Sequence, residues 1–118
     1  MNKADLKKQY KQTLPPMGIY QIKNLTNGKI LIGKTKNLTA RQNRFEFEMN
    51  FGGDPQSEIY ADYKKYGKEN FAYNILDTLK PVEDPAYKYD KDLEVLEDLW
   101  LEKLQPYGEK GYNEKKPE

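Results

Sequence analysis

No cysteine and no histidine occurs among the 118 residues of this chain. The absence of cysteine excludes disulfide bonds and thiol nucleophiles, and it favours an intracellular location. The absence of histidine excludes Ser-His-Asp and Cys-His catalytic systems and, together with the missing thiols, ordinary zinc sites. A metal ion bound to this protein would need oxygen ligands, which points to Mg²⁺, Mn²⁺ or Ca²⁺.

Long apolar runs are also missing. No stretch approaches the roughly 18 consecutive apolar residues that a membrane span requires, so we expect no membrane association. The basic first 16 residues lack the apolar core of a signal peptide. Hydrophobic residues make up 36% of the chain, which suffices for one small α+β domain with a modest core.

The charge is unevenly distributed along the chain, although its net value is only +1. Residues 1–50 contain ten Lys and Arg against three Asp and Glu, whereas residues 51–118 contain ten against sixteen. A basic half can attract a polyanion such as nucleic acid. A solvated surface whose two ends happen to differ would produce the same counts, so charge alone leaves both interpretations open.

Residues 1–16 predict a short helical extension ahead of the main domain. Leu6, Tyr10 and Leu14 recur every four residues, and Pro15-Pro16 ends the helix. This extension either docks on the domain or supplies its four lysines to a phosphate backbone.

Residues 18–33, GIYQIKNLTNGKILIG, predict a β-hairpin, because Asn27-Gly28 is a strong signal for a two-residue type I′ turn. With that turn Tyr20 and Leu31 project from the same face of the hairpin, and Gly33 lies between them. Gly33 has no side chain, so it leaves room on that face for a close approach. The expected opposite pairs are Asn24 with Leu31, Ile22 with Gly33, and Tyr20 with Thr35.

Two of the remaining elements carry a charge on an otherwise apolar stripe. A buried charge is costly unless it is paired or binds a metal. Arg41 and Glu97 therefore either form a buried ion pair or belong to a functional site, and Tyr20 alone could simply be a packing residue. The expected elements are a helix capped by Asn37 or Thr39 and running to about residue 50, a helix over about 57–66, a strand over 71–76 and a helix over about 91–104.

Five short motifs occur in an order that is typical of one known protein family. They are GIY (18–20), LIG (31–33) with Arg41 eight residues after its glycine, YGKENFAYNIL (66–76), LEDLW (96–100) and GYN (111–113). Together they resemble the GIY-YIG nuclease domain family, most closely the catalytic domains of phage and group I intron homing endonucleases. The resemblance covers residues 17–113, between the extension and a tail at 114–118. It implies an α+β fold with a small three-stranded antiparallel sheet flanked by helices.

The resemblance also implies a function, which is hydrolysis of DNA phosphodiester bonds with one divalent metal ion, Mg²⁺ or Mn²⁺. Tyr20 would activate or orient the attacking water, and Arg41 would hold the scissile phosphate. Glu97 would bind the metal, and Asn113 would support the site. The chemistry agrees, because the planar fork of arginine matches phosphate oxygens and Mg²⁺ commonly takes only one or two carboxylates.

The arrangement of this site leads to three further expectations. Tyr20, Arg41 and Glu97 should converge on one concave face that binds a DNA strand. Tyrosine has an ordinary pKa near 10, so Tyr20 would need nearby positive charge to act as a base. The expected substrate-binding side chains are Lys34, Lys36 and Arg44.

Two positions depart from the family pattern. Leu31 replaces the second tyrosine, and Phe45 replaces a histidine that often follows the arginine by four residues. Lys34 is a candidate to reach in as a substitute. The alternatives are therefore a catalytically degenerate domain that binds nucleic acid or a protein partner without cleaving, and an interaction protein that uses its ten tyrosines. Sequence specificity is expected from the N-terminal extension, the loops or a protein partner.

Overall fold

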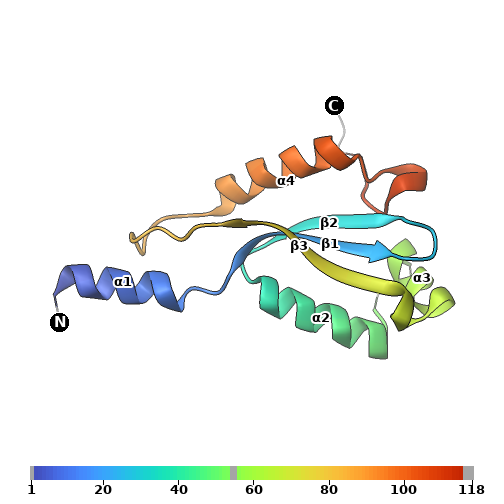
Figure 1. Cartoon of the computed structure of the whole chain (residues 1–118), viewed down its shortest axis with the longest axis horizontal. Coiled ribbons are helices and arrows are strands. Elements are labelled where there is room, and N and C mark those ends of the chain that lie inside the picture. Colours follow the sequence, from blue (N-terminus) through green and yellow to red (C-terminus); the bar gives the residue numbers. More distant parts are fainter. Residues whose placement is uncertain (1, 54–55, 116–118) are drawn as a thin grey trace.

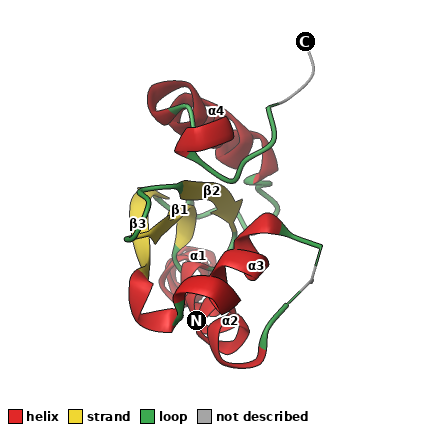
Figure 2. Ribbon diagram, turned by 90° about the vertical axis from the view of Figure 1, so that its right-hand side faces the viewer, coloured by secondary structure: helices red, strands yellow, loops and turns green. Residues whose placement is uncertain are grey.

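The computed structural model describes residues 2–53 and 56–115, which form an α+β fold of three layers. A three-stranded antiparallel sheet with strand order β2-β1-β3 lies in the middle. Helices α2 and α3 cover one face, and helix α4 covers the other (Figures 1 and 2), so the predicted fold class is confirmed. The elements are α1 (Lys3–Thr13), β1 (Met17–Asn24), β2 (Ile30–Thr35), α2 (Leu38–Phe51), α3 (Glu58–Tyr66), β3 (Phe71–Leu79) and α4 (Asp90–Leu104), with single 3₁₀ turns at Lys68–Asn70 and Gly108–Lys110.

Local capping signals explain where the helices begin and end. Asn37, rather than Thr39, caps α2, because its side-chain oxygen accepts a hydrogen bond from the Ala40 amide at 2.9 Å. Gly52 and Gly67 terminate α2 and α3 with positive φ angles of 87° and 86°, which glycine adopts readily. In the part of the chain that the structure describes, no helix is long and apolar enough to cross a membrane.

The hairpin register differs from the prediction by two residues. Tyr20 lies opposite Gly33, and Ile22 lies opposite Leu31. The turn is a four-residue loop, 25–28, instead of a two-residue turn. A slip of two positions preserves the alternation of side chains, so Tyr20 and Leu31 still share a face, as predicted.

The side chain of Asn24 explains the longer loop. Asn24 is fully buried, and its Oδ1 accepts a hydrogen bond from the Thr26 amide at 2.9 Å. Its backbone N–H donates to the Lys29 carbonyl at 2.8 Å, which closes the loop, and its Nδ2 donates to the Tyr112 hydroxyl at 3.1 Å. The type I′ turn was predicted from local turn propensity alone. The hydrogen bonds of the Asn24 side chain, including its tertiary contact to Tyr112, favour the longer loop over that turn.

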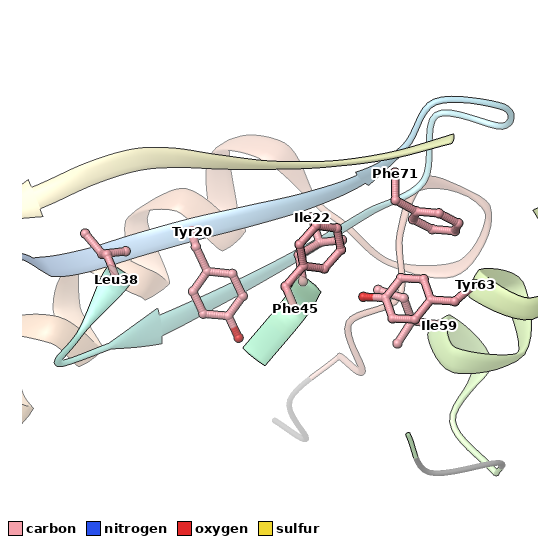
Figure 3. Packing of buried hydrophobic residues seen from close by; sticks show 7 residues of the cluster. All are labelled: Tyr20, Ile22, Leu38, Phe45, Ile59, Tyr63 and Phe71. Carbon is pink, nitrogen blue, oxygen red and sulfur yellow. The ribbon is translucent and has the colours of Figure 1, made fainter. Parts of the chain in front are cut away.

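Each face of the sheet carries its own core. Ile19 and Tyr20 are consecutive in β1 and point to opposite faces. Ile19 packs with Ile32 and with Leu101 of α4, whereas Tyr20 packs on the side of α2 and α3. Figure 3 shows this second cluster, which consists of Tyr20, Ile22, Leu38, Phe45, Ile59, Tyr63 and Phe71.

Candidate active site

The ring of Tyr20 lies against the backbone of Gly33. A Cβ atom added at position 33 would sit 2.5 Å from Cζ of Tyr20 and closer still to its hydroxyl. The space that Gly33 leaves is thus filled by the tip of Tyr20 itself. Tyr73 of β3 also stacks with this ring, with 5.7 Å between centroids. These contacts hold the Tyr20 hydroxyl beside the edge strand β2, where it makes no hydrogen bond to the described residues.

Arg41 of α2 lies over the ring of Tyr20. Its guanidinium carbon is 4.8 Å from the ring centroid, a distance at which a cation is attracted to the ring face. Its Nη1 atom is buried and has no hydrogen-bond partner among the described residues. The ion pairs of the described residues include neither Arg41 nor Glu97, so the alternative of a buried Arg41–Glu97 pair is wrong.

Glu97 lies on the helix that covers the opposite face of the sheet from Tyr20 and Arg41. In α4 it sits half-buried between Leu93 and Leu101, both of which are buried. The helices that carry Arg41 and Glu97 thus cover opposite faces, so these side chains could meet only around the open edge of β2. Their convergence with Tyr20 on one concave face stays a prediction. The periodicity of a helix shows which side of it faces the sheet, but it does not show which face of the sheet the helix covers.

Asn113 holds the outer edge of β2 through the backbone of one residue. Its Oδ1 accepts a hydrogen bond from the Ile32 amide at 2.9 Å, and its Nδ2 donates to the Ile32 carbonyl at 2.8 Å. Just before it, Gly111 forms a parallel bridge with Ile30. Asn113 thus acts on β2 as a short additional strand would, and its amide group is occupied by this contact.

After Ile32, Lys34 is the next residue of β2 whose backbone groups point away from β1. Backbone groups of an edge strand alternate between the partner strand and the outside, so the N–H and C=O of Lys34 point outward as those of Ile32 do. The Lys34 side chain is exposed and forms no ion pair with the described residues. Residues 33–35 therefore form an open edge of the sheet, between the face that carries Tyr20 and the face that α4 covers.

The other two predicted substrate-binding cations are engaged in ion pairs. Lys36 Nζ lies 2.7 Å from Oδ1 of Asp90, and this contact lowers the pKa of the Asp90 carboxyl. Arg44 Nε lies 2.7 Å from Oε1 of Glu48, and the bond raises the pKa of the Arg44 guanidinium. Both cationic side chains remain more than 60% exposed, so each could still reach an external phosphate.

The two positions that depart from the family pattern have different surroundings. Phe45 is only 7% exposed, and its ring packs against Tyr63 and Tyr73, each with 6.0 Å between centroids. Leu31 is half-buried and lines an open pocket of about 680 Å³ together with Tyr112 and Asn113. A larger side chain therefore has room at position 31 but not at position 45.

Residues that the sequence did not single out also support this region. The Tyr112 hydroxyl donates to Oδ2 of Asp62 at 2.6 Å while accepting from Asn24, so it ties α3 to the hairpin loop and the C-terminal segment. Burial and then the Asp62 bond raise the pKa of Tyr112. Glu48 is buried, and one of its carboxylate oxygens has no partner among the described residues. Glu48 follows Arg41 by seven residues, which is two helical turns, and this spacing could have indicated that Glu48 shares a side of α2 with Arg41.

Comparisons with known proteins agree with this fold. No protein-family model matches the chain. Over 88 residues, 74% of its length, the chain is 30% identical to Intron-associated endonuclease 1 of Enterobacteria phage T4. The match spans only 32% of that protein, so the chain corresponds to a part of it.

Solved structures of the catalytic domain of intron endonuclease I-TevI are similar as well. The domain itself superposes with a TM-score of 0.64 at 25% identity, covering 85% of this chain and 99% of the domain. A point mutant of the same domain superposes with a TM-score of 0.63 at 27% identity, covering 83% of this chain and 92% of the mutant.

Proposed function

Because the chain carries a domain similar in sequence and fold to GIY-YIG nuclease domains, we propose that it is a metal-dependent DNA endonuclease that hydrolyses phosphodiester bonds. The single observation that supports this most strongly is the environment of Arg41. Its guanidinium is held on the Tyr20 ring and has one buried nitrogen with no partner among the described residues. A buried donor without an acceptor is costly, and the half-buried guanidinium would be stabilised by a phosphate bound to its remaining donors.

The proposed roles follow from the chemistry of phosphoryl transfer. Arg41 would bind two oxygens of the scissile phosphate and stabilise the charge that develops on them, because arginine presents a planar pair of donors. The Tyr20 hydroxyl lies on the same face and has no hydrogen bond to the described residues, so it would orient the attacking water.

Glu97 is the proposed ligand of the divalent metal ion. Its half-buried carboxylate forms no ion pair with the described residues and is therefore available. In the described part of the chain no three acidic side chains gather in a group that could hold a metal ion, so substrate oxygens and water would complete the coordination. When bound, Mg²⁺ or Mn²⁺ would stabilise negative charge on the phosphate.

The position of Glu97 restricts how DNA could bind. Arg41 and Glu97 are on elements that cover opposite faces, and the open edge at residues 33–35 of β2 lies between those faces. A single DNA strand laid across this edge is the proposed substrate geometry. Lys34 would then contact the strand backbone at the crossing, and a protein partner or the loops would add sequence specificity.

The second candidate function is DNA binding without cleavage. Phe45 is buried in the core and Leu31 has no polar group, so neither can take part in proton transfer. Leucine at position 31 and phenylalanine at position 45 leave Arg41 and the exposed cations Lys34, Lys36 and Arg44 in place.

Incubation of supercoiled plasmid with the chain, with and without Mg²⁺ or Mn²⁺, tests the proposal. We expect nicked or linear DNA only when metal is present, and no product in EDTA. Plasmid that is bound but left intact in every metal would reject the nuclease and favour the second candidate.

A further inference from the structure

Helix α1 is a cationic element that the proposed active site does not use. It carries four lysines and one acidic residue, Asp5, within 11 residues. Lys3, Lys8 and Lys11 are exposed and Lys7 is half-buried. The ion pairs of the described residues include none of the four, so their charge is available to an external anion.

The segment after α1 anchors the helix to the domain. Leu14 packs against the buried cluster of Met17, Tyr89 and Leu93. The Pro16 carbonyl accepts a hydrogen bond of 2.8 Å from the amide of Leu38, the first residue of α2. Two consecutive prolines restrict the intervening backbone. The C-terminal end of α1 is therefore attached next to the start of α2, and the helix that carries the lysines extends from this point.

The direction of α1 extends the face that carries the candidate site. In both views α1 and α2 lie on the same side of the sheet (Figures 1 and 2). Helix α2 carries Arg41 and packs in the cluster of Tyr20. Figure 1 shows α1 projecting beyond the sheet along the long axis of the molecule. Lys3, Lys7 and Lys11 recur every four residues, so they lie along one side of the helix about 6 Å apart.

We infer that α1 is an arm that binds the phosphate backbone of DNA next to the proposed cleavage site. This inference rests on DNA being the substrate of the proposed function. A helix of 11 residues is about 16 Å long and would cover about five further nucleotide steps of a duplex. Its contacts are to phosphates, so they add affinity and not sequence specificity.

An anionic membrane surface is the other polyanion that a basic helix could bind. A helix lying in a membrane interface needs a broad apolar face opposite its charges. Among the described side chains of α1, Leu6 is the one large apolar group that is exposed. This composition favours DNA as the ligand.

The test compares two variants with equal loss of charge. The first neutralises the arm, and the control neutralises four exposed lysines elsewhere in the domain. Glutamine and lysine have similar helix propensities, so α1 is retained, and circular dichroism verifies it. The arm variant is Lys3→Gln, Lys7→Gln, Lys8→Gln and Lys11→Gln, and the control is Lys80→Gln, Lys91→Gln, Lys103→Gln and Lys110→Gln.

Affinity for a 30-base-pair duplex is measured in EDTA over a range of salt concentrations, so that no cleavage occurs. Each phosphate contact contributes about 0.9 to the slope of log affinity against log salt. We expect the slope of the arm variant to fall by about 2 to 4, and that of the control by less than 1. When the duplex is shortened by about five base pairs, so that it no longer reaches α1, the difference in salt slope between the two variants should become smaller.

Equal slopes for the two variants would overturn the inference, as would a loss of binding to phosphatidylserine vesicles with unchanged binding to DNA. Plasmid cleavage with metal is measured separately for each protein. If the parent chain binds DNA through α1 but never cleaves, the proposed function fails and the arm stands. If the parent cleaves and the arm variant binds with an unchanged slope, the arm fails and the nuclease stands.

Discussion

The tip of the Tyr20 side chain occupies the space that Gly33 leaves in the neighbouring strand. The two residues lie directly opposite each other in the β1–β2 ladder, and a Cβ atom at position 33 would overlap the Tyr20 ring at 2.5 Å from Cζ. The absence of a side chain at one position therefore determines where the hydroxyl at the other can lie. This relationship makes the GIY tyrosine and the LIG glycine one structural unit.

Replacing Gly33→Ala should displace the Tyr20 ring. Overpacking a tight site commonly costs about 1–3 kcal/mol, so we expect a lower unfolding midpoint together with slower plasmid cleavage. Tyr20→Phe is the matched control, because the hydroxyl has no hydrogen bond to the described residues. That variant should keep the stability of the parent and lose only activity. A Gly33→Ala protein with unchanged melting and unchanged rate would contradict the observed packing.

Arg41→Ala should slow cleavage by about 10²- to 10³-fold, which is the usual cost of removing one positioned transition-state donor. Arg41→Lys should rescue little of the rate, because an ammonium group lacks the planar fork of arginine. Arg44→Ala is the comparison on the same helix, because Arg44 is exposed and pairs with Glu48. Its melting temperature is measured as well, since the change leaves the buried Glu48 carboxylate without its partner. Single-turnover cleavage rates provide the comparison. Equal losses in the Arg41 and Arg44 variants would show that only general positive charge matters.

Glu97→Ala should abolish metal-dependent cleavage and leave DNA binding within about twofold, because it removes the proposed metal ligand and no cation. Glu102→Ala, an exposed carboxylate on the same helix, should cleave as the parent does. Titration of Mn²⁺ against cleavage rate supplies the measurement. A Glu97→Ala protein that cuts as fast as the parent at low Mn²⁺ would assign the metal to other ligands.

Leu31→Tyr should raise metal-dependent cleavage about tenfold or more, because it returns a hydroxyl to the face of Tyr20. Leu31 is half-buried and lines an open pocket, so we expect little loss of stability from the larger ring. Phe45→His is an informative contrast, since it places a polar ring in a core position and should lower the melting temperature. An unchanged rate in Leu31→Tyr at unchanged stability would exclude position 31 from the chemistry.

Asn113→Ala removes two hydrogen bonds to the backbone of Ile32, and each such bond contributes about 0.5–1.5 kcal/mol. We expect unfolding at lower denaturant concentration and faster hydrogen exchange at the Ile32 amide. Glu114→Ala, an exposed neighbour, should change neither. Slower cleavage with fully protected Ile32 would instead indicate direct contact between Asn113 and the substrate.

The elements that the sequence predicted well are those whose signals are local. Asn37, one of the two predicted caps, and the apolar stripes located each helix to within a few residues. The side-chain alternation placed Tyr20 and Leu31 on one face, and this held even though the turn was wrong. Alternation depends only on the parity of the register, which a slip of two positions does not change.

The tertiary structure decided what depends on contacts between distant segments. The burial of Asn24 against Tyr112, 88 residues later, set the length of the hairpin loop. The layer order placed α4, which carries Glu97, and α2, which carries Arg41, on opposite faces of the sheet. The return of the chain to the β2 edge put Asn113 on the backbone of Ile32. A sequence pattern reports which side of an element is apolar, but the choice of the surface that covers it is made by packing the whole chain at once.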